Sequence, residues 1–130
     1  KFFNIEDRKI KLQIFDLSGN EIFQSINTAY VPGAQCVIIV FDVSQQMPKE
    51  YLDRWINFAK EKRGEILHEI VLVGNKNDLH RLVSVKEAEK FATEHGIHYF
   101  DVSAKCNYNI DEMFTFLATQ IYLHKKNNKQ

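Results

Sequence analysis

Two short apolar runs constrain the fold of this chain more than any other feature. Cys36-Val-Ile-Ile-Val-Phe41 and Ile70-Val-Leu-Val73 carry no charged side chain, and both are rich in β-branched residues. Runs of this kind are typical of strands in a parallel sheet that is covered on both faces. Ile97–Val102 is a weaker run of the same character. The sequence therefore predicts a mainly parallel sheet inside the domain.

A different pattern stands near the start of the sequence. Lys9–Phe15 alternates between polar and apolar residues, which predicts a half-buried strand near the edge of a sheet. Phe2–Ile5 precedes it across the polar residues Glu6-Asp7-Arg8. Two such segments separated by a short polar turn predict an antiparallel hairpin at the edge of the sheet.

Helical patterns separate the predicted strands. Apolar residues recur at helical spacing in three stretches, which begin near Pro48, Ser84 and Asn109. Ser84 with Glu87 three residues later forms a capping box, Gly96 is expected to end that helix, and Asn109 is expected to cap the third helix. Alternating strands and helices predict an α/β fold: a mainly parallel sheet with helices on both faces and an antiparallel edge hairpin.

Composition narrows the function classes. The 130 residues include 17 Lys plus Arg and 17 Asp plus Glu, and this zero net charge argues against bulk electrostatic binding to nucleic acid. No apolar run approaches the roughly 20 residues of a membrane helix. Two cysteines far apart in the sequence indicate neither a CxxC motif nor a disulfide framework. We expect one domain over residues 1–124 and a polar tail over 125–130.

Polar clusters follow three of the predicted strands. They are Asp16-Leu-Ser-Gly19, Asn75-Lys76-Asn77-Asp78 and Ser103-Ala104-Lys105. Because ligands of open parallel sheets bind beyond the carboxyl ends of the strands, the three clusters are expected along one rim. An Asp at a strand end can hold a hydrated Mg²⁺, and a Gly three residues later lets a backbone N–H approach a phosphate.

The second and third clusters suit a guanine base. Asp78 could accept hydrogen bonds from the N1–H and the exocyclic amine of guanine, which adenine cannot supply. The aliphatic stems of Lys76 and Lys105 are long enough to cover the two faces of a planar base. Asn75 would brace its loop, and the backbone N–H of Ala104 could meet the guanine carbonyl.

These clusters resemble the third, fourth and fifth nucleotide motifs of Ras-superfamily small GTPases, in order. Within that superfamily the chain resembles the Rab family in particular. Four further stretches carry this resemblance: Lys11-Leu-Gln-Ile-Phe15, Ile22-Phe-Gln-Ser-Ile-Asn27, Tyr30-Val-Pro-Gly-Ala34 and Ile39-Val-Phe-Asp-Val-Ser44. The resemblance implies a P-loop GTPase fold that binds GTP or GDP with Mg²⁺. It assigns Asp16 to the metal, Asp16 and Gly19 to sensing of the γ-phosphate, and the residues of the other two clusters to the base.

The same resemblance implies a partner surface and a cellular setting. Effector and regulator proteins would bind the second switch, through Phe15, Ile22, Phe23 and Tyr30. The implied role is a guanine-nucleotide-dependent switch in vesicle trafficking, in the cytoplasm or peripherally on the cytosolic face of endomembranes. Membrane association is expected only if a lipidated tail follows these residues.

Two departures from the family bear on catalysis. The sequence contains no Gly-x-x-x-x-Gly-Lys-Ser/Thr phosphate loop, so we expect triphosphate affinity to collapse and this segment alone to be inactive. We expect these residues to belong to a longer chain, or a partner to fill the gap. Asn20 stands where the family usually has the Gln that positions the attacking water, which predicts slow GTP hydrolysis. The alternative is a degenerate GTPase fold that acts as a scaffold subunit without turnover.

Overall fold

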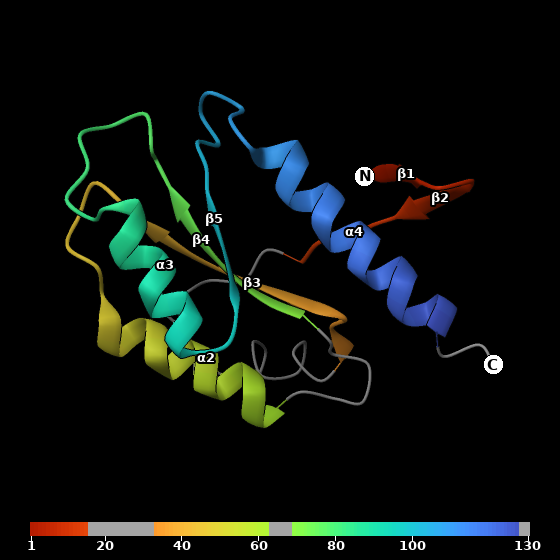
Figure 1. Cartoon of the computed structure of the whole chain (residues 1–130), viewed down its shortest axis with the longest axis horizontal. Coiled ribbons are helices and arrows are strands. Elements are labelled where there is room, and N and C mark those ends of the chain that lie inside the picture. Colours follow the sequence, from red (N-terminus) through yellow and green to blue (C-terminus); the bar gives the residue numbers. More distant parts are fainter. Residues whose placement is uncertain (16–32, 63–68, 128–130) are drawn as a thin grey trace.

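The described residues of the computed structural model, 1–15, 33–62 and 69–127, form two sheets and three helices. The elements follow in the order β1 (Phe2–Ile5), β2 (Arg8–Lys11), β3 (Cys36–Asp42), α2 (Lys49–Lys62), β4 (Glu69–Asn75), α3 (Val85–Glu94), β5 (His98–Asp101) and α4 (Ile110–Asn127) (Figure 1). Strands β3, β4 and β5 are parallel neighbours in that order, and β1 pairs with β2 antiparallel. The predicted α/β class, with its parallel sheet and hairpin, is confirmed.

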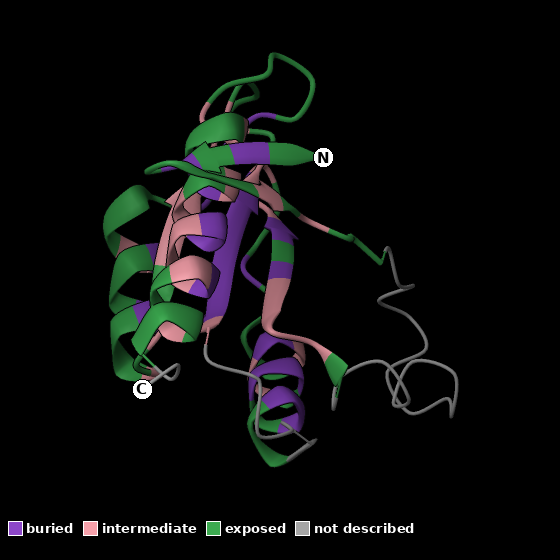
Figure 2. Ribbon diagram, turned by 90° about the vertical axis from the view of Figure 1, so that its right-hand side faces the viewer, coloured by how far each residue is buried: buried purple, intermediate pink, exposed green. Residues whose placement is uncertain are grey.

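Helices lie on both faces of the parallel sheet (Figure 2), but they do not cover both faces of β3 as the sequence predicted, since Val40 is 52% exposed. Strand β4 shows why its apolar run is continuous. Ile70 and Leu72 belong to the core cluster that contains residues of α2 and α3. Val71 and Val73 point to the opposite face and pack with residues of α4. Since successive side chains of a strand alternate between faces, a strand covered on both sides has no position for a polar residue.

Helix α3 begins and ends next to the predicted residues, and the Ser84 half of the capping box is present. The Ser84 hydroxyl accepts a hydrogen bond from the backbone N–H of Glu87 at 3.1 Å, which satisfies one donor of the first turn. Gly96 follows the helix with a left-handed φ of 70°, a conformation that glycine adopts without steric cost. Helix α4 begins after Asn109 as expected, but the Asn109 side chain donates from Nδ2 to the carbonyl oxygen of Asp101 at 3.1 Å. That contact ties the start of α4 to the end of β5.

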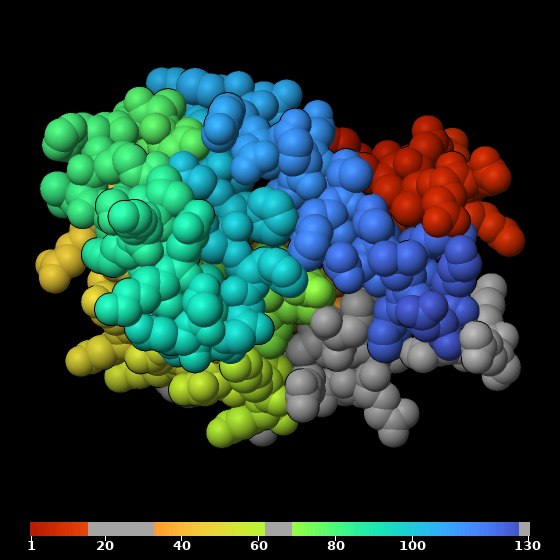
Figure 3. Space-filling view, in the orientation of Figure 1, coloured from red at the N-terminus to blue at the C-terminus, as the bar shows by residue number. Residues whose placement is uncertain are grey.

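The hairpin differs in position from the expectation. It forms a two-stranded sheet of its own, and β2 is shorter than the predicted strand Lys9–Phe15. Phe3 and Ile5 are buried with Ala118 of α4, so the hairpin packs on that helix (Figures 1 and 3). Within the described residues it does not pair with β3. In the alternating segment, Ile10 and Leu12 are half-buried against the cluster of the hairpin and α4, but Ile14 is exposed.

A groove of about 1310 Å³ lies along β2, β3 and α4. Its lining includes Ile10 from the hairpin, Ile38 from β3 and Phe114 from α4, so it is largely apolar. None of the helices in the described ranges has the combined length and apolar character that crossing a membrane requires.

Candidate functional site

Two loops meet beyond the carboxyl ends of neighbouring parallel strands. The β4 loop, residues 75–84, begins with the last residue of β4 and leads to α3. The β5 loop, residues 102–109, leads from β5 to α4. Because β4 and β5 are parallel and adjacent, the chain leaves both strands at the same edge of the sheet, where the sequence predicted a ligand site.

Direct hydrogen bonds join the two loops. The Ser103 hydroxyl donates to Oδ1 of Asp78 at 2.7 Å, across 25 positions of sequence. The backbone N–H of Ala104 donates to Oδ1 of Asn75 at 3.0 Å. The backbone N–H of Asn77 donates to the carbonyl oxygen of Val102 at 3.1 Å. The structure thus brings together Asn75, Asp78, Ser103 and Ala104, which the sequence predicted as base-binding residues.

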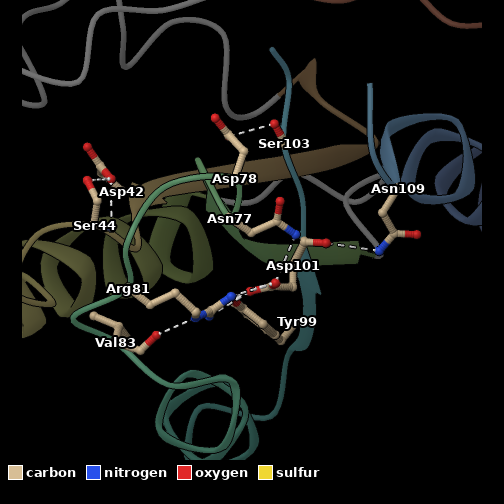
Figure 4. Close-up of polar contacts among 10 residues, drawn as sticks. All are labelled: Asp42, Ser44, Asn77, Asp78, Arg81, Val83, Tyr99, Asp101, Ser103 and Asn109. Carbon is tan, nitrogen blue, oxygen red and sulfur yellow. Dashed lines mark hydrogen bonds and ion pairs between the residues drawn. The ribbon is translucent and has the colours of Figure 1, made fainter. Parts of the chain in front are cut away.

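Asp78 is held from the protein side and exposed on the other. Ser103 is fully buried, and its hydroxyl oxygen also accepts from the backbone N–H of Cys106 at 3.1 Å. Its single proton is therefore committed to Asp78. Asp78 itself is exposed, and its second oxygen points away from Ser103 in Figure 4. A carboxylate oriented in this way can accept hydrogen bonds from a donor group outside the protein.

The backbone N–H of Ala104, which the sequence predicts as a donor to the guanine carbonyl, has a partner within the protein. It donates to the Asn75 side chain. Asn75 therefore braces the two loops against each other. A base carbonyl that used the Ala104 N–H would have to share this donor with Asn75 or replace it.

The two lysines lie on different loops. Lys76, in the β4 loop, has a left-handed φ of 66°, and its ammonium nitrogen lies 3.1 Å from Oδ2 of Asp42. Asp42 ends β3 and also accepts from the hydroxyl of Ser44 at 2.6 Å and from its backbone N–H at 2.8 Å. These bonds from Ser44, with Lys76, outweigh burial and lower the pKa of Asp42. Lys105 is exposed in the β5 loop, next to Ala104.

The sequence did not predict a polar network that lies behind the two loops. Asp101, at the end of β5, receives two parallel hydrogen bonds from the Arg81 guanidinium at 2.8 and 2.9 Å (Figure 4). The Tyr99 hydroxyl donates to Asp101 at 2.6 Å, and Nδ2 of Asn77 donates at 3.1 Å. Burial opposes ionisation of Asp101, but the hydrogen bonds from Arg81, Tyr99 and Asn77 outweigh it and lower its pKa. Burial also raises the pKa of Tyr99, and the hydrogen bond to Asp101 adds to that effect.

Gly74 makes room for this network. A Cβ atom at Gly74 would overlap the Tyr99 hydroxyl and would stand 2.7 Å from Cγ1 of Val43. A glycine at this position of β4 therefore lets Tyr99 lie across the strand with its hydroxyl directed to Asp101.

Several predicted site residues lie outside the described part of the chain. They are Asp16, Gly19, Asn20, Ile22, Phe23 and Tyr30, all within residues 16–32. Phe15 is described, and its side chain is exposed. Within the described ranges no group of three His, Cys, Asp or Glu side chains is placed to hold a metal ion. The Mg²⁺ role of Asp16 therefore rests on the sequence resemblance.

The parallel sheet, the helices on its two faces and the polar loops after β4 and β5 define the class: the chain has part of a P-loop GTPase fold. The family model described as "Ras family" matches residues 1–123. The chain belongs to the Ras family, and within that superfamily it is a Rab-like small GTPase.

Curated relatives support the Rab-like assignment. Ras-related protein Rab-13 of Bos taurus is 41% identical over 134 residues, which cover 97% of this chain and 66% of the relative. Ras-related protein Rab-2B of Dictyostelium discoideum is 41% identical over 127 residues, which cover 96% of this chain and 62% of the relative. The chain thus spans less than two thirds of the length of these relatives.

Proposed function

We propose that these residues supply the guanine-recognition part of a Rab-like small GTPase, a nucleotide-dependent switch in vesicle trafficking. The observation that carries the proposal is the pair of loops joined by the Asp78–Ser103 and Asn75–Ala104 hydrogen bonds. They place an exposed carboxylate, oriented by a buried hydroxyl, at the strand ends of a parallel sheet. Ras-family membership supports guanine as the base.

The proposed mechanism of base selection depends on donor and acceptor matching. Guanine presents its N1–H and exocyclic amine side by side, and the Asp78 carboxylate accepts from both. Adenine presents no matching pair of donors, so the carboxylate loses its water and gains no partner. Lys76 and Lys105 would cover the faces of the base with their stems, and Lys76 would keep or exchange its ion pair with Asp42 when it does so.

The remaining roles in the proposal come from the family resemblance. Asp16 and Gly19 would respond to Mg²⁺ and the γ-phosphate, and Asn20 would position the attacking water less well than Gln does. Bound Mg²⁺ would supply charge neutralisation for the phosphates. Phe15, Ile22, Phe23 and Tyr30 would present the second switch to effectors and regulators. The location proposed is the cytoplasm, with peripheral attachment to endomembranes.

A scaffold without turnover is the second candidate. Asn20 favours it, because it stands where the family usually has the Gln that positions the attacking water. A base site with guanine preference would count against a pure scaffold, because structural support does not require selection among bases. Guanine preference without GTP hydrolysis, in a protein that carries the phosphate loop upstream of these residues, would favour a switch that does not turn over.

The test of the proposed function is base preference. GDP, IDP and ADP affinities are compared by calorimetry in a protein that carries the phosphate loop upstream of these residues; IDP carries hypoxanthine, which lacks the exocyclic amine. GDP should bind best, because losing a hydrogen bond to a charged group costs about 1.5–3 kcal/mol, or roughly tenfold or more in affinity. Asp78→Asn should weaken GDP and improve XDP, since the amide N–H can donate to the 2-carbonyl of xanthine.

The matched control is Asp53→Asn on α2, the same acid-to-amide change at a carboxylate that pairs with His95. It should leave the order of the nucleotides unchanged. Equal affinity for GDP and ADP in that protein, with Asp78 unchanged, would contradict the proposed function.

A further inference from the structure

The Asp101 network lies directly behind the base site and has no part in the proposed base contacts. Asp101 is two residues before Ser103, and Asn77, which donates to it, is next to Asp78. Arg81 reaches the same carboxylate from the far part of the β4 loop. One side chain of β5 thus holds the β4 loop at two points, on either side of Asp78.

The Arg81–Asp101 contact is fixed in both distance and orientation. The two terminal nitrogens of Arg81 bond one carboxylate oxygen each, and Nε donates to the carbonyl oxygen of Val83 at 2.9 Å. The side chains are 26% and 21% exposed, so water competes only weakly for them. A planar two-point contact of this kind fixes orientation as well as distance, which a single ion pair does not.

The contacts at the base site itself are less constrained. Asn75 and Asp78 are held to the β5 loop by one hydrogen bond each, and Asp78 and Ala104 are exposed. Lys76, between them, has a left-handed backbone conformation that is unfavourable for a residue with a Cβ. A loop with such a residue keeps its shape only if neighbouring contacts hold it.

We propose that Arg81 and Asp101 are positioning residues that set the geometry of Asp78 for base recognition. This inference rests on the proposed function of the β4 and β5 loops. The Arg81–Asp101 contact keeps the β4 loop in register with β5, and in that register the Ser103 hydroxyl meets Asp78. Without the contact the carboxylate is still present, but its orientation toward a base is no longer fixed.

The experiment compares variants that keep the fold and remove the two-point contact. Arg81→Lys keeps the charge and a long stem, and Arg81→Met keeps the stem alone. Each should lower the preference for GDP over IDP by roughly tenfold, since a misplaced acceptor loses the exocyclic amine selectively. Asp101→Glu, which can still accept both guanidinium bonds, should keep most of the preference. Asp53→Asn is the control for a distant lost ion pair.

A second readout does not need nucleotide. Hydrogen exchange of the backbone amides of Ala104 and Cys106 reports the Asn75 and Ser103 contacts directly. Exchange at both amides should accelerate in Arg81→Lys and Arg81→Met, while the amides of β4 stay protected. Loss of β4 protection in Arg81→Met would show unfolding, and Arg81→Lys then carries the test.

The outcomes separate the two proposals. If the protein that carries the phosphate loop and no substitution has no preference for GDP, the proposed function fails, and amide exchange still decides whether Arg81 and Asp101 order the loops. If that unsubstituted protein prefers GDP and Arg81→Lys keeps both that preference and slow exchange at Ala104, the positioning role is overturned. A lower melting temperature with an unchanged preference for GDP over IDP would also overturn it, because the Arg81–Asp101 contact would then only stabilise the fold.

Discussion

The base side and the hairpin side of the molecule are held together by different kinds of contact. On the base side, hydrogen bonds with defined geometry join two loops, and a partly buried Arg–Asp contact lies behind them. On the hairpin side, Phe3 and Ile5 are buried with Ala118 of α4, and the surrounding ion pairs are exposed. The groove along β2, β3 and α4 lies next to this second contact. The comparison indicates that the described residues order the base side largely by themselves, whereas the hairpin is attached by a small apolar patch.

Matched core truncations should show the largest difference between the two sides. Ile56 of α2 is fully buried in a cluster of fifteen described residues, whereas Ile5 lies in a cluster of three. Ile56→Ala should cost about 3–5 kcal/mol of unfolding free energy, and Ile5→Ala about 1–2 kcal/mol, because the hairpin can relax over the space. Urea denaturation measures both. Equal losses would show that the hairpin is as tightly built as the sheet core.

An added methyl group at Gly74 should come next in size. Gly74→Ala forces either Tyr99 or the fully buried Val43 to move, and it should cost about 1–3 kcal/mol by overpacking. Gly33→Ala is the matched control, since a Cβ there meets no atom within 4 Å. Thermal melts of the two variants should differ clearly. A neutral Gly74→Ala would mean that Tyr99 leaves Asp101 at little cost and that the base side is less rigid than its hydrogen bonds indicate.

The Asp101 contacts should weaken in acid. The pKa of Asp101 is lower in the folded chain than the ordinary value of about 3.9, so the ionised form stabilises the fold above that value. This contribution is lost as the pH falls through the folded-state pKa. Asp101→Asn resembles the protonated carboxyl, so its melting temperature should lie below that of the unaltered chain at pH 7. The gap should begin to narrow below about pH 4 and close below the folded-state pKa. A gap that stays constant down to pH 3 would show that ionisation of Asp101 is not what stabilises the network.

The sequence predicted the parallel core and the proximity of the β4 and β5 loops, because both follow from local patterns along the chain. Strand β4 alternates its apolar side chains between α4 and the other two helices, so a continuous apolar run was a reliable signal. The motifs around Asp78 and Ser103 follow adjacent parallel strands, and the strand-end rule places them together. The same rule could have identified Asp42, which ends β3 and pairs with Lys76.

The other features of the fold and the site depend on contacts between residues far apart in the sequence, which a pattern along the chain does not identify. Arg81 and Asp101 look like ordinary polar residues of a loop and a weak strand, and their pairing appears only in the register of β4 against β5. The alternation around Ile10 predicts a half-buried strand, but it does not say that the hairpin packs on α4. Gly74 gave no signal either, since its role depends on the ring of Tyr99 from the neighbouring strand.

The smallest effect is expected at the ion pair between the hairpin end and α4. The ammonium of Lys1 lies 2.6 Å from Oδ1 of Asp111, but the two side chains are 50% and 59% exposed. Exposed pairs of this kind contribute about 0–1 kcal/mol, so Lys1→Gln should change the unfolding free energy by less than about 0.5 kcal/mol. Lys1 is the better residue to change, because Asp111 also stands in the first turn of α4, where a negative charge is favourable by itself.

Salt provides the independent check on Lys1. The unaltered chain and Lys1→Gln should respond alike to 0.1 and 1 M salt, concentrations at which the Debye length falls from about 10 to 3 Å. A loss well above 1 kcal/mol that disappears in high salt would mean that charge, and not the patch around Phe3 and Ile5, holds the hairpin. The two sides of the molecule would then differ in the exposure of their ion pairs but not in how much they depend on them.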